Sequence, residues 1–324
     1  MTKVIENEKT GIERAFYNAK DTTFNNVTID GPEDGESAFK ECRNIKVNNS
    51  SMVLRYPFWH CHNFEITNSN FAVGSRASLW YCTEGKITNT KLVSVKAIRE
   101  CTKIDISDCE FESEEFGWKS HFLNIKNLKL TGLIAFMDSD NIKIDNLTLK
   151  GKYSFQYDEN VTITNSKLDT KDAFWHSKNV YVKDSILKGE YIAWYSENLT
   201  LENCHIDGIQ PLCYCKNLKL INCTMENCNL AFEYSDVMAD VHSHISSIKN
   251  ILKGKVIVDG YDEYINDCQV YPCKGEIEVR KKKEFPYRFQ RKHSSADILI
   301  SESWPPKLRQ YISLSSVYIK FTEY

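Results

Sequence analysis

One set of positions carries side chains that could bind a ligand or do acid–base chemistry. These positions recur every 19 residues, with a single step of 21, and each holds a tyrosine or an ionisable residue. We call the set the Tyr/His column, and its members are Glu41, His60, Tyr81, Glu100, Lys119, Asp138, Tyr157, His176, Tyr195, Tyr214 and Glu233. Aromatic faces can stack on pyranose rings, while carboxylates and imidazoles can bond to hydroxyls. The pattern therefore favours an extended sugar chain as ligand.

The centre of the column is the strongest candidate for catalysis. If each 19-residue step is one coil, Glu100 and Asp138 lie two coils apart, or about 9.6 Å from the spacing of neighbouring strands. That distance is close to the upper end of carboxylate separations in inverting glycosidases, roughly 6.5–9.5 Å. Lys119 lies between the two acids and Arg99 lies beside them. These four residues are the predicted catalytic set, and the alternative is a charge-compensated structural cluster.

The rest of the column is predicted to bind ligand without chemistry. The predicted ligand-binding residues are His60, Tyr81, Tyr157, His176, Tyr195, Tyr214 and Glu233. The two histidines are six coils apart, roughly 29 Å, so they cannot cooperate directly. The alternative is a ladder of mixed side chains that is stabilised by stacking and alternating charge.

A repeat with the same period must position this column. Asparagine or aspartate recurs at 19-residue steps, with one step of 21, at Asn49, Asn68, Asn89, Asp108, Asn127, Asn146, Asn165, Asp184, Asn203 and Asn222. Apolar residues lie two and four positions before each, and three positions after it. This alternation predicts three short strands per coil. Asn and Asp tolerate left-handed backbone, so they are expected at the corners, where stacked amides can form a ladder.

The third predicted strand has sequences such as AFWHS (173–177) and SLWYC (78–82), and its fourth position is the Tyr/His column. A column of Glu, Lys and Asp would be prohibitively costly in a dry core, so we expect it to face outward. Alternation then predicts that the third position, with Trp59, Trp80 and Trp175, faces inward. The fifth position is mostly cysteine or serine, which we interpret as a stack of free thiols acting as compact apolar groups. Zinc-site spacing is absent.

The fold predicted from these patterns is an all-β parallel solenoid of about ten 19-residue coils. Residues 1–43 are expected to form an N-terminal cap with a first irregular coil, and residues 44–236 the repeats. Residues 237–282 are expected to form a C-terminal cap, because solenoid ends need covering. Residues 283–324 lose the period and carry a basic run, so we interpret them as a disordered or non-native tail.

Composition narrows the class of protein. The net charge is −3 and the pI about 6.3, which argues against a nucleic-acid partner. No run of 18 apolar residues or signal peptide occurs, so we expect a cytoplasmic protein without a membrane partner. No cofactor or metal is expected, because phosphate loops are absent and His242 with His244 lacks a third ligand. Glycosylation patterns at Asn26, Asn146, Asn160, Asn198 and Asn222 follow from the Asn-rich repeat.

Several segments resemble a known family. RYPFWHC (55–61), KDAFWHSKNV (171–180), GEYIAWYSENLTLENC (189–204), QPLCYC (210–215) and NLAFEYSD (229–236) are similar to a bacterial family of parallel β-helix proteins of unknown function. The resemblance covers roughly residues 5–282. It implies a right-handed helix with pectin-lyase-like architecture, and it supplies no established catalytic residues.

Three functions remain open from the sequence. The preferred hypothesis is a non-catalytic carbohydrate- or small-ligand-binding β-helix that uses the Tyr/His column, with an oligosaccharide or other extended ligand as partner. The first alternative is a polysaccharide lyase or glycoside hydrolase acting on the same face. The second is a structural or interaction scaffold.

Overall fold

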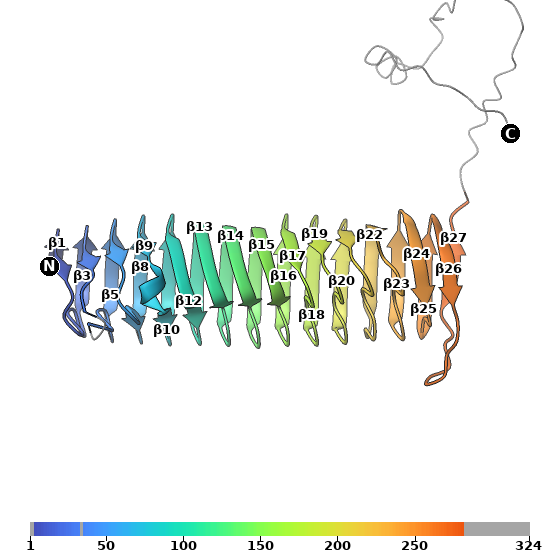
Figure 1. Ribbon diagram of the computed structural model, residues 1–324, viewed down its shortest axis with the longest axis horizontal. Helices are drawn as coiled ribbons and strands as arrows, with labels where there is room; N and C mark the ends of the chain where they lie inside the picture. The colour runs from blue at the N-terminus through green and yellow to red at the C-terminus, as the bar shows by residue number, and fades with distance from the viewer. Residues whose placement is uncertain (1–2, 33–34, 282–324) are drawn as a thin grey trace, which may run out of the picture. The chain divides into compact units, whose positions relative to one another are not determined.

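The computed structural model describes residues 3–32 and 35–281. Over these residues the chain winds into a right-handed parallel β-helix whose coils stack along one axis (Figure 1). Every pairing in the main sheet is parallel and joins strands of successive coils. The predicted 283–324 tail lies outside the described residues.

One face is a continuous sheet, which we call the main face. Its strands are β1 (Lys3–Glu6), β3 (Lys20–Asn25), β5 (Arg43–Asn48), β8 (His62–Thr67), β11 (Thr83–Thr88), β13 (Thr102–Phe116), β14 (His121–Ala135), β15 (Asp140–Ser154), β16 (Glu159–Thr164), β18 (Lys178–Lys183), β20 (Glu197–Glu202), β22 (Leu218–Glu226), β23 (Asp236–Val241), β25 (Lys253–Val258) and β27 (Glu276–Val279). The long strands β13, β14, β15 and β22 run around the Asn/Asp corner into the second face.

The second face is built from shorter strands. They are β2 (Lys9–Thr10), β4 (Thr28–Ile29), β6 (Ser51–Met52), β9 (Asn70–Phe71), β12 (Lys91–Arg99), β17 (Lys167–Thr170), β19 (Ile186–Lys188), β21 (His205–Asp207), β24 (His244–Lys249) and β26 (Gly260–Ile265). The third side of the coil is formed by the AFWHS-type segments. Among the described residues it has only two separate strands, β7 (Phe58–Trp59) and β10 (Ala77–Trp80), and the short helix η1 (Val73–Ser75) precedes β10.

The solenoid has about 14 turns rather than the predicted ten. Coils also form at both ends, where the 19-residue period is interrupted. Thr22 pairs with Ile45, a step of 23 residues, and Ala239 pairs with Val256, a step of 17. Residues are added in the first step and removed in the second, in both cases between the paired strands, so pairing continues although the sequence period does not. The segments expected as caps therefore contribute coils of their own.

The third side also differs from the predicted strand. From Phe136 to Tyr214 its second and fourth residues adopt left-handed backbone, as at Phe174 (φ 61°) and His176 (φ 55°). Two such residues so close together break the alternation of an extended strand. The second-position side chains point into the core, and those of the fourth position point out.

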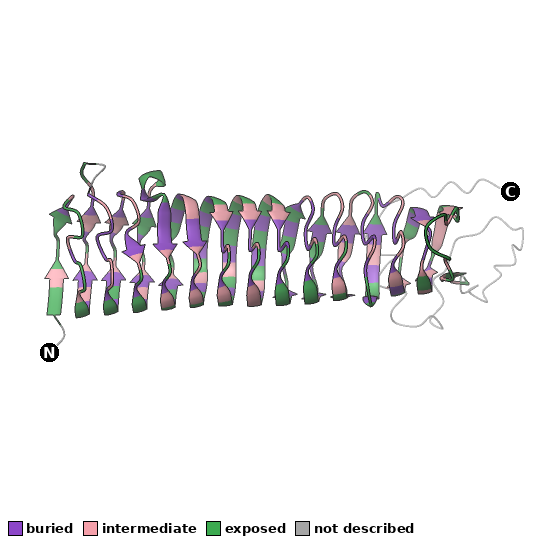
Figure 2. Cartoon of the chain, turned by 90° about the horizontal axis from the view of Figure 1, so that it is seen from below, coloured by how far each residue is buried: buried purple, intermediate pink, exposed green. Residues whose placement is uncertain are grey.

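The prediction that the third position faces inward is therefore wrong. Most of its residues, including Trp59, Trp80, Trp175 and Trp194, are half-buried, so they lie at the edge between core and surface. The core is formed instead by the second position and by the apolar residues that flank the Asn/Asp corner, all of which are buried (Figure 2). Phe136, Phe155 and Phe174 are fully buried and stack with centroids 4.7 and 5.2 Å apart.

The cysteine and serine column is buried, as predicted from its compact side chains. Cys42, Cys61 and Cys101 have no exposed surface above 1%, and the Cys61 thiol contacts the carbonyl oxygen of Phe39 at 2.8 Å. Burial raises the pKa of Cys61 and of Cys101 well above the ordinary thiol value. Two cysteines outside this column, Cys268 and Cys273, form a disulfide.

These thiols are expected to be chemically silent in the folded protein, because thiolate formation and access are both suppressed. In the native chain at pH 8, fewer than one thiol per molecule should react with Ellman's reagent. In guanidinium chloride the ten free cysteines should all react. Rapid reaction of several thiols without denaturant would contradict the burial of this column.

The Asn/Asp corners adopt left-handed backbone in every repeat, with φ between 48° and 61°. Side-chain amides donate between coils, for example from Asn146 to Asn127 at 2.8 Å and from Asn203 to Asp184 at 2.8 Å. These bonds run along the helix axis and link several pairs of neighbouring coils.

Candidate functional site

The Tyr/His column lies on the surface along the third side of the solenoid. His60, Lys119, Asp138 and His176 are exposed, and the exposed fraction of Tyr157 is 55%. Glu41, Glu100, Tyr214 and Glu233 are half-buried. Left-handed backbone at the fourth position, present at every predicted member except Glu233, turns these side chains outward. The expected direction of the column is thus correct, although the strand expected to produce it is largely a turn.

The aromatic members of the column stack on one another in two runs. His60 and Tyr81 form the first run, with ring centroids 4.9 Å apart. The second run is Tyr157, His176, Tyr195 and Tyr214, with centroid spacings of 5.3, 4.9 and 4.8 Å and interplanar angles of 4°, 8° and 13°. Because each face is covered by the next ring, a ligand meets ring edges carrying hydroxyl and imidazole groups.

The predicted catalytic residues occupy the gap between these two runs. Lys119 and Asp138 form an ion pair at 3.7 Å, and Arg99 contacts Glu100 at 3.3 Å. Arg99 also pairs with Glu115 at 3.1 Å, so each of the four predicted residues has an opposite charge beside it. This is the geometry of a charge-compensated cluster, and the catalytic role stays a prediction.

The half-buried tryptophans hold this cluster in place. The Arg99 guanidinium lies 4.6 Å from the ring centre of Trp118 and 5.8 Å from that of Trp80. Such cation–π contacts position Arg99 between coils and leave its charge directed at Glu100 and Glu115.

At the C-terminal end of the column the predicted member Glu233 is wrong by one residue. The Tyr214 N–H donates to the Glu233 carbonyl oxygen, and Tyr234, with φ of 50°, stacks on Tyr214 with a centroid distance of 5.9 Å, so Tyr234 takes the fourth position and Glu233 the third. Glu233 pairs with Lys249 at 2.9 Å, and that contact raises the pKa of Lys249.

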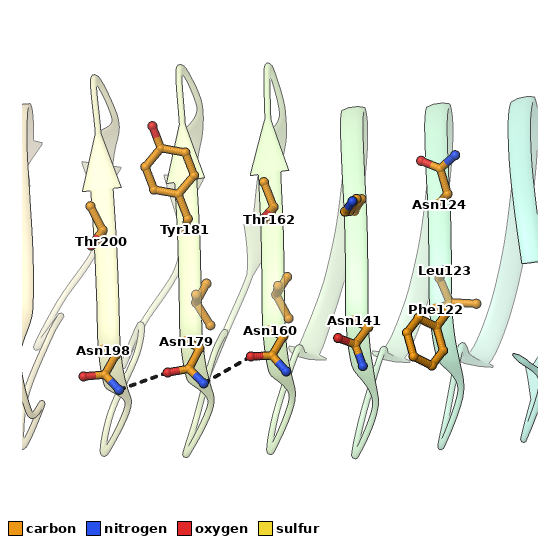
Figure 3. A pocket seen from close by; sticks show the side chains of 13 residues that line it. Phe122, Leu123, Asn124, Asn141, Asn160, Thr162, Asn179, Tyr181, Asn198 and Thr200 are labelled. Carbon is orange, nitrogen blue, oxygen red and sulfur yellow. Dashed lines mark hydrogen bonds between the residues drawn. The ribbon is translucent and has the colours of Figure 1, made fainter. Parts of the chain in front are cut away.

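Sequence reasoning missed a second candidate site on the outer surface of the main face. A hollow of about 940 Å³ lies over β14, β15, β16, β18 and β20 (Figure 3), and we call it the amide groove. Its central lining residues are Asn160, Asn179, Asn198, Thr162, Tyr181 and Thr200. At its β14 end lie Phe122 and Asn124.

The asparagines of the groove form a ladder of their own. Each follows the cysteine/serine column by two residues and opens the main-face strand in left-handed backbone, with φ of 59°, 55° and 56° at Asn160, Asn179 and Asn198. Asn179 donates to Asn160 at 3.1 Å and Asn198 donates to Asn179 at 2.9 Å (Figure 3). The sequence contains this ladder as a second set of asparagines spaced 19 residues apart. Two of them, Asn160 and Asn198, also match the glycosylation pattern.

Tyr181, on the fourth of the five strands, is the aromatic residue between Thr162 and Thr200 in the groove. Its register neighbours on adjacent coils are Thr162 and Thr200, whose short side chains leave the ring faces uncovered. The phenol hydroxyl donates to Glu202 at 2.7 Å, and this bond raises the pKa of Tyr181. Glu202 is in turn paired with Lys183 at 2.8 Å. The ring therefore lies between two small residues, and the bond to Glu202 fixes its hydroxyl end.

An acid–histidine contact fixes the β14 end of the groove. The Nδ1 atom of His121 is 2.6 Å from a carboxylate oxygen of Asp140, and Asn141 donates to the other oxygen at 2.5 Å. Asn141 is part of the groove lining. The contact holds the Asn141 amide in place.

Within residues 3–32 and 35–281, no group of three His, Cys, Asp or Glu side chains is arranged to hold a metal ion. No helix in this part of the chain has the length and apolar character needed to span a bilayer.

The parallel pairing of successive coils and the repeated corners define the class as a right-handed parallel β-helix protein. Residues 3–278 match the family described as "Protein of unknown function (DUF3737)", and the chain belongs to this family. The predicted resemblance is thereby confirmed. A comparison with curated proteins found no match.

Solved structures with a similar architecture are distant. A surface adhesin of Streptococcus pneumoniae, PfbA, is 12% identical with a TM-score of 0.41, over 65% of this chain and 72% of that one. A double mutant of the periplasmic alginate epimerase AlgG is 12% identical with a TM-score of 0.27, over 80% and 76%. At these TM-scores neither protein contributes to the functional argument.

Proposed function

We propose that the protein is a non-catalytic carbohydrate-binding β-helix and that the Tyr/His column is its binding surface. The observation that supports this most directly is the row of polar ring edges from Tyr157 to Tyr214. Its rings are spaced 4.8–5.3 Å apart, so hydroxyl and imidazole groups recur at a nearly constant interval. An extended sugar chain also presents hydroxyl groups at a constant interval, and can bond to several coils at once.

The chemistry of the row suits a polyhydroxylated ligand. Phenol hydroxyls donate and accept hydrogen bonds, and neutral imidazole does both through its two nitrogens. Each sugar hydroxyl can likewise donate and accept. The mutual stacking of His176 with Tyr157 and Tyr195 holds these groups in position before binding, which lowers the conformational entropy lost on association.

The test is a pair of substitutions in the longer aromatic run. The ligand is a saccharide that the unmodified protein binds on a glycan array. The double variant His176→Ala/Tyr195→Ala removes two adjacent polar ring edges and should weaken binding of this saccharide at least tenfold, the effect of losing about two hydrogen bonds. Binding is measured by calorimetry on the full chain. The control is Tyr17→Ala, because Tyr17 has the same 55% exposure as Tyr157 and lies outside the column.

Equal binding by the double variant and the control would exclude the column as the binding surface. Absence of any saccharide hit for the unmodified protein would overturn the proposed function itself. Breakdown of a bound saccharide into smaller products by the unmodified protein would show that the protein is catalytic.

A further inference from the structure

We infer that the amide groove is a second binding site of this protein and that it takes a neutral oligosaccharide. The class of ligand rests on the proposed function, whereas the site is distinct from the Tyr/His column. Within each coil the two rows are three residues apart, as with His176 and Asn179 or Tyr195 and Asn198. They therefore run parallel along the solenoid, with the groove on the main face.

The first argument is the hydrogen-bonding capacity left in the amides. An asparagine side chain has two N–H donors and an oxygen that accepts two bonds. Asn198 donates once, to Asn179 at 2.9 Å, and accepts once, from Asn217 at 2.9 Å. Among the described residues it has no other side-chain partner, so one donor and one acceptor site of this groove-lining amide remain unused. Asn160 accepts from Asn179 and has both N–H groups unused among those residues.

The second argument is the uncovered aromatic ring of Tyr181. The rings of the Tyr/His column cover one another, whereas Tyr181 has only Thr162 and Thr200 beside it. No ring of the described residues stacks on Tyr181, and its bond to Glu202 fixes its orientation. A sugar ring can therefore lie against the Tyr181 face while its hydroxyl groups reach the amides. A pyranose ring likewise has an apolar face and hydroxyl groups that donate and accept hydrogen bonds, so it matches the ring and the amides of the groove.

The third argument is the change of charge along the main face. At the register position of Tyr181, earlier coils carry Lys46, Glu65, Lys86, Asp105 and Lys143, and the following coil carries Lys219. Only the three coils of Thr162, Tyr181 and Thr200 are uncharged in succession. Lys143 is the one ionic side chain of the groove lining. This local neutrality favours a neutral sugar chain over a polyanionic one.

The fourth argument is length. The groove runs from Phe122 on β14 to Asn198 on β20. These strands are four coil steps apart, which corresponds to roughly 19 Å at the usual strand spacing. That is long enough for a short linear oligosaccharide and too long for a single sugar to fill.

The experiment compares two matched asparagines in the full chain. Asn198→Gly removes one groove amide, and Asn203→Gly removes a corner amide outside the groove. Both residues have left-handed backbone (φ 56° and 52°), both are exposed, and each donates one and accepts one ladder bond. Glycine keeps this backbone without strain, so the structural effects should match. Tyr181→Thr removes the ring, and Tyr181→Phe retains it.

The probes are cellohexaose, maltohexaose, laminarihexaose and mannohexaose, titrated separately by calorimetry, with oligogalacturonate as the anionic comparison. We expect one neutral probe to bind the unmodified protein and the Asn203→Gly variant equally. Asn198→Gly and Tyr181→Thr should each weaken it about tenfold, the effect of about 1.4 kcal/mol, while Tyr181→Phe retains most binding.

Three results would overturn the inference. The first is equal weakening by Asn198→Gly and Asn203→Gly, which would assign the effect to the solenoid rather than to the groove. The second is binding that depends on His176 and Tyr195 but not on Tyr181, which would leave the proposed function intact and remove the groove. The third is binding of oligogalacturonate alone, or of no probe.

Discussion

Replacement of Phe155 by alanine is expected to lower the free energy of unfolding by about 3–5 kcal/mol, the usual cost of truncating a buried aromatic residue. Phe155 has no exposed surface and is stacked between Phe136 and Phe174 at 4.7 and 5.2 Å. The cavity would open in the middle of a continuous core, where neighbouring coils are held in register and cannot collapse into it. Guanidinium denaturation followed by circular dichroism measures the loss.

The control for this prediction lies two residues away. Tyr157 has nearly the same left-handed backbone (φ 61° against 57°), so alanine introduces similar strain at both positions. Its side chain is 55% exposed, and the expected loss for Tyr157→Ala is about 1 kcal/mol or less. Equal losses for the two variants would mean that backbone strain dominates and that the phenylalanine stack contributes little.

Replacement of Asp158 by serine is expected to stabilise the protein at neutral and alkaline pH. Asp158 is fully buried in the cysteine/serine column, and burial raises the pKa of its carboxyl group well above the ordinary value. One oxygen accepts the Ser139 N–H at 2.9 Å and the other has no partner among the described residues. Serine already occupies this column at Ser139 and Ser177, and its hydroxyl can accept the same bond.

The sign of the pH dependence follows from the raised pKa. The folded chain keeps the Asp158 proton at a pH where the unfolded chain, with an aspartate pKa of about 3.9, has lost it. Proton binding by Asp158 therefore contributes fully to the folding stability below the unfolded-state pKa. This contribution is lost as the pH rises through the pKa that Asp158 has in the folded chain. At pH 4 the variant and the unmodified protein should be similar in stability, whereas at pH 8 the variant should be more stable by about 1–3 kcal/mol.

Denaturation midpoints measured from pH 4 to pH 8 test this prediction. Asp158→Asn should also remove the pH dependence, but it buries an amide group where one oxygen had no partner, so it should be less stable than the serine variant. A stability difference between Asp158→Ser and the unmodified protein that stays constant with pH would contradict a protonated buried carboxyl.

The inner faces of the coils could be predicted because burial of one face of each strand is enough to produce the alternation of apolar and polar residues. Val161 and Ile163 alternate with polar residues as a half-buried strand requires, and both are buried in β16. The corner residues were equally readable, since Asn165 and Asp184 are types that accept left-handed backbone.

The third side could not be predicted, because bulky residues there occupy a conformation that their types disfavour. Phe174 and His176 both have positive φ, which pairing with adjacent coils imposes and single-residue preferences do not indicate. The amide groove was missed for another reason. Its hollow depends on Thr162 and Thr200 lying beside Tyr181, and that arrangement exists only once residues 19 apart are stacked.

The repeated 19-residue coil has a consequence for the evolution of this molecule. Because each coil repeats the same backbone and bonds only to its neighbours, gain or loss of one 19-residue unit would leave the remaining coils unchanged. Either surface row would then lengthen or shorten by one rung. Under the proposed function, the number of 19-residue repeats encoded by the gene would therefore set the length of sugar chain that each row can contact.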